Sequence, residues 1–90
     1  MNLHNSMEDV VYRYLDSVLS KYNNVCKCTK CKLDIVALAL NNLPPQYTVT
    51  EKGKLFTKVK EMEAQYEVDI VREITKAIEI VSRKPHHENG

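Results

Sequence analysis

The sequence predicts an all-α fold: a small helical domain with a cysteine knuckle between its first two helices and a long C-terminal helix. Two observations support this prediction. Apolar residues recur at every third or fourth position near the beginning of the chain and throughout its last third, as they do along one face of a helix. All three cysteines fall within six consecutive residues between two helical segments. We expect a single domain over residues 1–90, with an ordered core at about 6–84 and a tail at 85–90.

Composition and charge limit the classes of protein to which the chain can belong. Of its 90 residues 43 % are hydrophobic and 28 % are charged, which is typical of a globular domain. Thirteen Lys and Arg against twelve Asp and Glu leave a net charge of +1, which does not favour nucleic acid as a partner. The first nine residues lack the features of a signal peptide, and the longest apolar run is six residues, against the ~20 that span a bilayer. We expect a cytoplasmic protein without membrane contact, in a compartment that keeps thiols reduced.

The first predicted helix begins at Ser6, whose side chain can cap it, with Glu8 and Asp9 at the positive end of the helix dipole. It extends to about Lys21, and Asn23-Asn24 ends it because asparagine favours turns. Its apolar stripe consists of Val11, Tyr14 or Leu15, Val18, Leu19 and Tyr22.

The second predicted helix begins at or just after Cys31 and ends at about Asn41. Its residues 35–40 are apolar on every side, which indicates the central element of the core. A buried strand is the alternative, but four of these six residues are Ala or Leu, which favours a helix. Pro44-Pro45 stops the helix, because the residue before a proline is displaced from helical geometry. Residues 46–50 then form an extended connection.

The last predicted helix covers residues 54–84, which include neither glycine nor proline. Roughly thirty helical residues extend about 45 Å, whereas a compact domain of this size is about 26 Å across. We therefore expect a second copy of the chain to cover the remaining apolar surface, which makes the protein a homodimer. A break near Glu63-Ala64-Gln65 is the alternative. The apolar stripe consists of Leu55, Val59, Met62, Tyr66, Ile70, Ile74, Ala77 and Val81.

Cys26, Cys28 and Cys31 form the pattern C-x-C-x-x-C. The CxxC part lets two sulfurs reach one ion from a single turn, and Cys26 adds a third sulfur. A redox-active CxxC normally follows a strand in an α/β fold, and nothing in this chain alternates strand with helix. Thiols without a metal, or oxidised ones, are the remaining alternative. We predict a Zn²⁺ ion on these cysteines, with a structural role because three thiolates make zinc a poor Lewis acid.

A tetrahedral zinc ion needs a fourth ligand, for which the candidates are His4, Asp34, His86, His87 or a group from a second chain. About sixteen helical residues, or roughly 24 Å, separate His4 from Cys26. The two C-terminal histidines follow the last helix, which returns towards the cysteines if neighbouring helices are antiparallel. We predict that His86 or His87 completes the site; a water molecule is the alternative.

Four lysines, Lys21, Lys27, Lys30 and Lys32, surround the cysteines. They can form an anion-binding patch. The alternative is that they only offset the negative charge of the zinc–thiolate centre.

A second candidate ligand site follows the Pro44-Pro45 turn. Tyr47 offers an aromatic platform, and Lys52, Lys54 and Lys58 stand at a helix start. Such a combination can hold a phosphorylated nucleotide. The alternative is that Thr50 caps the last helix and Tyr47 packs on the core.

Three motifs of this chain occur together in a known family. Cys26-x-Cys28-x-x-Cys31 is followed by the run Asp34-Ile35-Val36-Ala37-Leu38-Ala39-Leu40-Asn41, and then by Leu43-Pro44-Pro45-x-Tyr47 and the long last helix. With these motifs, roughly residues 8–85 resemble the ComFB family of late-competence proteins. The resemblance implies a small all-α fold that dimerises and, in members with these cysteines, a zinc ion on Cys26, Cys28 and Cys31. Some similar members have a fourth cysteine in the C-terminal tail, where this chain has His86 and His87. Family members that lack the cysteines act as receptors for cyclic di-GMP.

No motif in the sequence indicates an enzyme, since there is no G-x-S-x-G, no phosphate loop and no His/Asp/Ser arrangement. We therefore expect a non-enzymatic, zinc-stabilised dimeric protein that regulates competence or interacts with an unknown protein partner. A cyclic di-GMP receptor is the first alternative. A nucleic-acid-binding module, suggested by the lysines near the cysteines, is the second.

Overall fold

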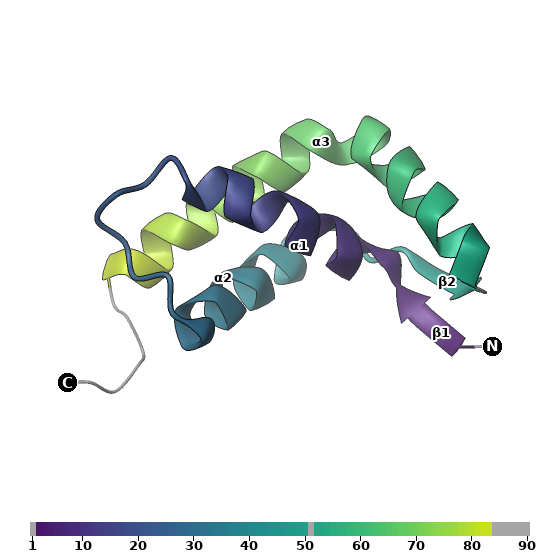
Figure 1. Cartoon of the computed structure of the whole chain (residues 1–90), viewed down its shortest axis with the longest axis horizontal. Coiled ribbons are helices and arrows are strands. Elements are labelled where there is room, and N and C mark those ends of the chain that lie inside the picture. Colours follow the sequence, from purple (N-terminus) through teal and green to yellow (C-terminus); the bar gives the residue numbers. More distant parts are fainter. Residues whose placement is uncertain (1, 51, 84–90) are drawn as a thin grey trace.

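Over the residues that the structure describes, the chain folds into three helices and two short strands. The computed structural model describes residues 2–50 and 52–83, with side chains for residues 3–49 and 60–83. In chain order the elements are β1 (Asn2–Asn5), α1 (Ser6–Leu19), α2 (Thr29–Asn41), β2 (Tyr47–Thr50) and α3 (Lys52–Arg83). Figure 1 shows the strands at one end of the long axis and the loop between α1 and α2 at the other. The predicted all-α fold is thus right for the three helices and wrong in leaving out the strands.

The two strands form an antiparallel ribbon in which Leu3 lies opposite Val49 and His4 lies opposite Thr48. The extended connection predicted at residues 46–50 contains β2, whereas the sequence pattern indicated no element at the position of β1. A strand of four residues is too short to show a clear alternating pattern. Its formation depends on a partner strand more than forty positions away. The fold is therefore mostly helical rather than purely helical.

Two adjacent residues join the beginning of α1 to the ribbon. Asn5, and not Ser6 as predicted, is the N-cap, because its Oδ1 accepts a hydrogen bond from the backbone N–H of Met7 at 3.1 Å. The same oxygen accepts a bond from the backbone N–H of Gln46 at 2.9 Å. Ser6 is the first helical residue, and its buried hydroxyl lies 2.9 Å from the hydroxyl of Thr48. The cap of α1 is therefore also a contact between distant segments.

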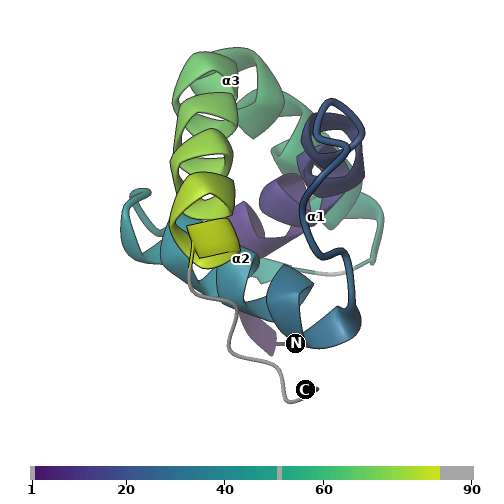
Figure 2. The same cartoon turned by 90° about the vertical axis from the view of Figure 1, so that its left-hand side faces the viewer.

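The hydrophobic core lies where α1 and α2 pack against α3, as the end-on view in Figure 2 shows. The central element is α3, because it contacts both of the other helices over much of its length. The prediction that α2 is central is wrong, since Ala37 is exposed and Leu33 is 50 % exposed. Only one face of α2 is buried, and alanine on the other face costs little to leave in water. The buried residues of α2 are Cys31, Ile35, Val36 and Ala39.

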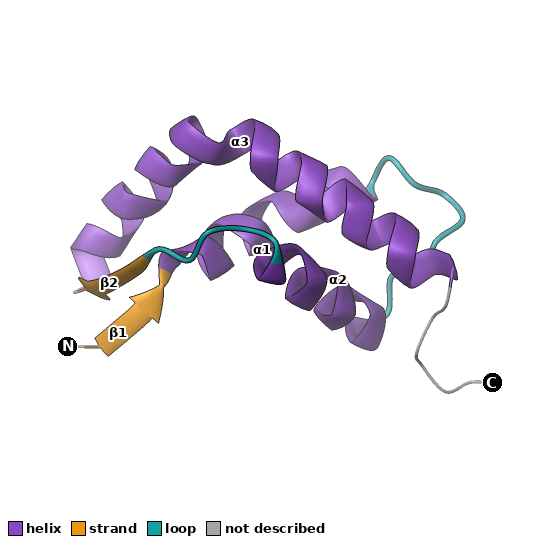
Figure 3. Ribbon diagram, turned by 180° about the vertical axis from the view of Figure 1, so that it is seen from behind, coloured by secondary structure: helices purple, strands orange, loops and turns teal. Residues whose placement is uncertain are grey.

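α3 is one continuous helix of 32 residues, without the alternative break near Glu63. Figures 1 and 3 show it arched over the other two helices, as long helices often curve around a core. The molecule measures 42 × 25 × 19 Å, so this single helix spans most of its length. Of its described apolar side chains, Val68 and Ile80 are more than half exposed. Among the described residues no helix is both long and apolar enough to cross a membrane.

Candidate metal site

The three cysteines lie on the connection between α1 and α2 and on the first turn of α2. After Leu19 the chain makes a turn in which the backbone N–H of Tyr22 donates to the carbonyl of Leu19 at 2.9 Å. Tyr22, Val25 and Cys26 then pack partly against the core. The connection is therefore anchored on the helices before it reaches Cys28.

Cys28 is the N-cap of α2. Its backbone is extended, with φ −72° and ψ 166°, and its Sγ accepts a hydrogen bond from the backbone N–H of Cys31 at 3.5 Å. Its carbonyl accepts the bond from the N–H of Lys32 at 2.9 Å, which closes the first helical turn. The helix thus begins at Thr29, two residues before the predicted start. Cysteine is not among the usual N-cap residues, so the sequence pattern did not indicate this start.

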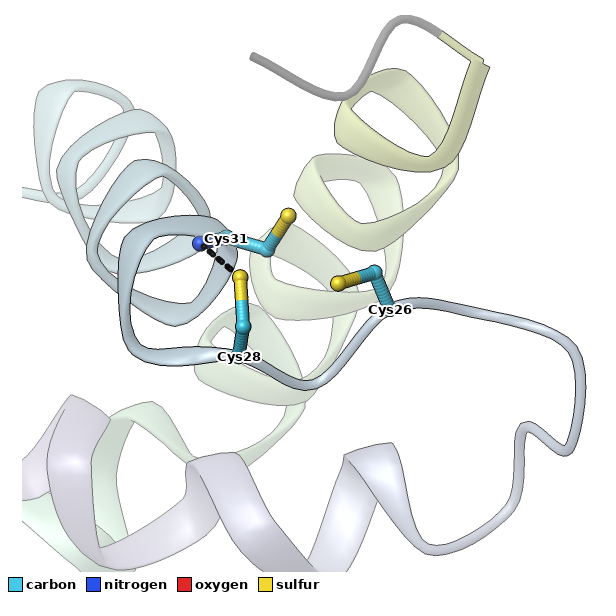
Figure 4. Close-up of side chains that lie close together, drawn as sticks. All are labelled: Cys26, Cys28 and Cys31. Atoms are coloured by element: carbon cyan, nitrogen blue, oxygen red, sulfur yellow. Dashed lines mark hydrogen bonds between the residues drawn. The ribbon is translucent and has the colours of Figure 1, made fainter. Parts of the chain in front are cut away.

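The sulfur atoms of the three cysteines lie within 4.8 Å of one another. Figure 4 shows the side chains converging from the loop and from the first turn of α2. Sulfurs that share a tetrahedral zinc ion at 2.3 Å are about 3.8 Å apart, so small side-chain rotations would bring all three to one ion. No disulfide joins them. Among the described residues this is the one group of three potential metal ligands, and its geometry supports the predicted metal site.

The electrostatics of the site favour a cation beside the sulfurs. The hydrogen bond from the Cys31 N–H lowers the pKa of the exposed Cys28, and the side chain of Cys26 adds to this effect. Burial raises the pKa of Cys31 to about 12, and hydrogen bonds with the other two cysteines act in the same direction. Cys31 therefore retains its proton at neutral pH. A metal ion would replace this proton, because the thiolate is the ligand.

A cavity of about 240 Å³ adjoins Cys26 and Cys31. The end of α3 forms one side of it, so this helix does return to the cysteines, as antiparallel packing predicted. The sequence indicated the apolar face of α3 but not which of its residues would meet the loop. His86 and His87, the predicted fourth ligands, lie outside the described residues. Besides the two cysteines, the cavity is lined by Asn24, Val25, Ile35, Ile78, Val81 and Ser82.

His4 and Asp34, the other two candidates for the fourth ligand, each have a partner that is not one of the cysteines. His4 lies in β1, at the opposite end of the molecule from the cysteine loop (Figure 1), and contacts Asp9 of α1. Asp34 accepts a hydrogen bond from Lys30 one turn earlier in α2, at 2.9 Å.

Two of the lysines near the cysteines form ion pairs on the surface. Lys30 pairs with Asp34 at 2.9 Å, and Lys32 pairs with Asp16 of α1 at 3.3 Å. Lys27 is exposed on the loop. The two carboxylates reduce the positive charge that this surface offers to an anionic ligand.

The second predicted ligand site is described only in part. Tyr47 lies on β2 and is 61 % exposed, so the alternative in which it packs on the core is wrong. Lys52, Lys54 and Lys58 belong to the beginning of α3, but their side chains lie outside the described part of the chain. Their proximity to Tyr47 in space therefore stays a prediction.

Comparisons with known proteins agree with one another. The model of the family described as late competence development protein ComFB matches residues 4–85. Competence protein ComFB of Bacillus subtilis (strain 168) is 29 % identical over 83 residues, which are 92 % of this chain and 85 % of the relative. A solved structure of the late competence protein ComFB from Bacillus subtilis has a TM-score of 0.80 at 29 % identity, and covers 93 % of this chain and 92 % of the solved chain. The chain therefore belongs to the ComFB family.

Proposed function

We propose that the protein is a non-enzymatic regulatory module of late competence, built on a structural zinc ion, that acts as a homodimer on a protein partner. The convergence of three sulfurs at the junction of the loop, α2 and the end of α3 carries this proposal. Membership of the ComFB family supports the link to competence.

A zinc ion at this position would hold the loop to the first turn of α2. A domain of 90 residues has a small core and gains stability from such a cross-link. The free energy of zinc binding adds to that of folding when the unfolded chain lacks a formed site. Three thiolates also donate so much negative charge that the ion is a weak Lewis acid. The stability gained from the cross-link and the weak Lewis acidity of the ion both favour a structural role over a catalytic one.

We further propose that His86 or His87 supplies the fourth ligand. Val81 and Ser82 line the same cavity as Cys26, and α3 ends at Arg83. Three residues of chain reach at most about 10 Å, which is enough to cross a cavity of this size. The ion would then also fix the end of α3 to the loop.

The test is native mass spectrometry of the zinc-replete protein, followed by competition with a chromogenic chelator. We expect one zinc ion per chain in the wild type and none in Cys31→Ser. The double variant His86→Ala/His87→Ala should lose its zinc at a lower chelator concentration than the wild type. His4→Ala is the matched control, because His4 lies at the other end of the molecule.

The outcomes separate the parts of the proposal. A wild-type protein that holds no zinc refutes the structural ion. Zinc held as tightly by the double histidine variant as by the wild type places the fourth ligand elsewhere. For the role in competence, transformation frequency should fall in a strain that carries Cys31→Ser in place of the wild type, and an unchanged frequency contradicts that role.

Binding of cyclic di-GMP is a second candidate function. The exposed ring of Tyr47 supports it, since Tyr47 lies on the strand that precedes α3 and its lysines in the sequence. Aromatic side chains stack on nucleotide bases at about 1–3 kcal/mol per base. Calorimetric titration should show binding by the wild type and weaker binding by Tyr47→Ala. Tyr12→Ala, at a tyrosine of α1 that is 50 % exposed, is the control. Absence of heat with the wild type removes this candidate.

A further inference from the structure

The three cysteines of the candidate metal site differ in their access to solvent. Cys28, the N-cap of α2, is exposed, Cys26 is half-buried, and Cys31 is only 1 % exposed. Cys26 and Cys31 line the cavity beside the end of α3, whereas Cys28 is not part of its lining. A reagent that arrives from solvent therefore meets the sulfur of Cys28 before it meets the other two.

The backbone places Cys28 and Cys31 at a distance that suits a disulfide. They are the first and fourth residues of the helical turn that is closed by the hydrogen bond from the N–H of Lys32 to the carbonyl of Cys28, at 2.9 Å. Helical geometry puts α-carbons three positions apart at about 5 Å, within the roughly 4.4–6.8 Å found in disulfides. The N–H of Cys31 also donates to the Sγ of Cys28 at 3.5 Å, as Figure 4 shows. The Cys28 side chain therefore already points to the residue that would become its partner.

Cys26 is a less suitable partner for Cys28, although all three sulfurs lie within 4.8 Å of one another. Only Lys27 separates the two residues, so a bond between them would close a ring around a single intervening residue. So short a ring stores strain in the disulfide and in the backbone. Oxidation at Cys28 therefore favours Cys31 as the second sulfur.

We propose that Cys28 is a site of reversible oxidation by hydrogen peroxide, and that it forms a disulfide with Cys31 which releases the zinc ion. The release rests on the zinc ion of the proposed function, whereas the disulfide requires only the two cysteines. Zinc does not change its oxidation state, so both electrons come from sulfur. The disulfide consumes two of the three thiolates and leaves the ion with Cys26 and its fourth ligand, too few to hold it.

The reaction has two steps. The Cys28 thiolate attacks one oxygen of hydrogen peroxide, the O–O bond breaks, and the departing hydroxide takes a proton from solvent to become water. The sulfenic acid that results is attacked at sulfur by the Cys31 thiolate; an S–S bond forms, and the S–O bond breaks to give a second hydroxide, which is also protonated to water. The two thiolates lose two electrons and the peroxide gains them. A small thiol reverses the reaction by thiol–disulfide exchange.

Oxidation changes what holds this end of the molecule together. The zinc ion of the reduced site would cross-link the loop after α1 to the first turn of α2. The Cys28–Cys31 disulfide lies within that one turn, so it does not fix the rest of the loop. The loop then retains only the partial packing of Tyr22, Val25 and Cys26 against the core. Peroxide would thus loosen the loop without unfolding α2.

The test treats the full, zinc-replete chain with hydrogen peroxide under native conditions and follows zinc with a chromogenic chelator. We expect one zinc ion to leave each chain as two of the three thiols disappear, and to bind again after treatment with dithiothreitol. Alkylation followed by trypsin then assigns the bond, because Lys27 and Lys30 place the three cysteines on three different peptides. We expect Cys28 linked to Cys31, and Cys26 alkylated.

Two matched variants test the choice of partner in the zinc-free protein. Cys26→Ser keeps both proposed partners and should form its disulfide as fast as the zinc-free wild type. Cys31→Ser keeps the other pair of cysteines and should form an intramolecular disulfide at least tenfold more slowly. Circular dichroism will show whether the variants are folded. The peptide map of the wild type needs no variant and decides the partner if they are not.

Failure of this inference can be told apart from failure of the proposed function. A bond from Cys28 to Cys26, a disulfide only between chains, or a sulfinic acid at Cys28 without any disulfide refutes the oxidation site. Zinc that stays bound after the Cys28–Cys31 bond has formed, or that leaves while all three thiols can still be alkylated, refutes the coupling of oxidation to release. A wild type that holds no zinc refutes the structural ion of the proposed function, and its peptide map still decides the disulfide.

Discussion

The side chain of Asn5 connects three parts of the molecule, and its removal should be costly. Its Oδ1 accepts hydrogen bonds from Met7 of α1 at 3.1 Å and from Gln46, just before β2, at 2.9 Å. Both bonds are partly buried. Substitution by alanine leaves two backbone N–H groups without this acceptor.

The expected magnitude follows from these two contacts. Loss of an N-cap costs typically about 1 kcal/mol, and loss of a hydrogen bond in a folded protein costs about 1 kcal/mol more. Asn5→Ala should therefore lower the free energy of unfolding by about 2 kcal/mol. In a domain of this size that corresponds to a decrease in Tm of about 8–16 °C. Asn5→Asp should stay within about 0.5 kcal/mol of the wild type, because aspartate keeps the acceptor oxygen and caps helices equally well.

The assay is urea unfolding followed by far-UV circular dichroism. Protein concentration and free zinc must be held constant, since binding of a metal or of a second chain changes apparent stability by mass action. Asn23→Ala, at an exposed loop position, is the control. A loss below about 0.5 kcal/mol in Asn5→Ala, or an equal loss in Asn5→Asp, refutes the reasoning that the shared acceptor holds the cap and the ribbon together.

Three further predictions concern the core, the pH dependence and the metal. Ile74→Ala should cost about 2–5 kcal/mol in urea unfolding because Ile74 is fully buried, whereas Val68→Ala on the surface should change stability by less than about 0.5 kcal/mol. Burial, together with the hydrogen bond to Glu67, raises the pKa of Tyr14 to about 12, so the folded state favours the protonated phenol. Its stabilisation is complete below pH 10 and is lost as the pH rises to 12; urea unfolding across this range should therefore show a smaller decline in Tyr14→Phe than in the wild type. Zinc must displace the proton that the raised pKa keeps on Cys31, so calorimetry in buffers of different ionisation enthalpy should detect proton release, and zinc affinity should fall as the pH falls.

Local sequence patterns alone indicate the three helices and the cluster of three cysteines. Helical periodicity depends on residues three or four positions apart, so it indicated α1, α2 and the continuous α3 before any contact between them was known. The candidate metal site is similarly local, because Cys26, Cys28 and Cys31 come together through a single loop and one helical turn. Short-range patterns of this kind do not depend on how the rest of the chain packs.

The boundaries of the elements were less predictable, because they depend on individual hydrogen bonds. Asn5 caps α1 in place of Ser6 partly because its oxygen also bonds to Gln46, forty-one positions away. α2 begins early because Cys28, an unusual cap, bonds to the N–H of Cys31. Neither choice follows from the propensity of the residue alone.

The meeting of distant segments, in contrast, is a property of the tertiary structure. It paired Asn2–Asn5 with Tyr47–Thr50, made α3 rather than α2 the centre of the core, and brought the end of α3 to the cysteine loop. It also turned Leu3 and Val49 outwards while His4 and Thr48 face α1. Most of these features arise from contacts between segments far apart in the sequence, whose free energies depend on the packing of the whole chain. The local sequence pattern does not contain that information.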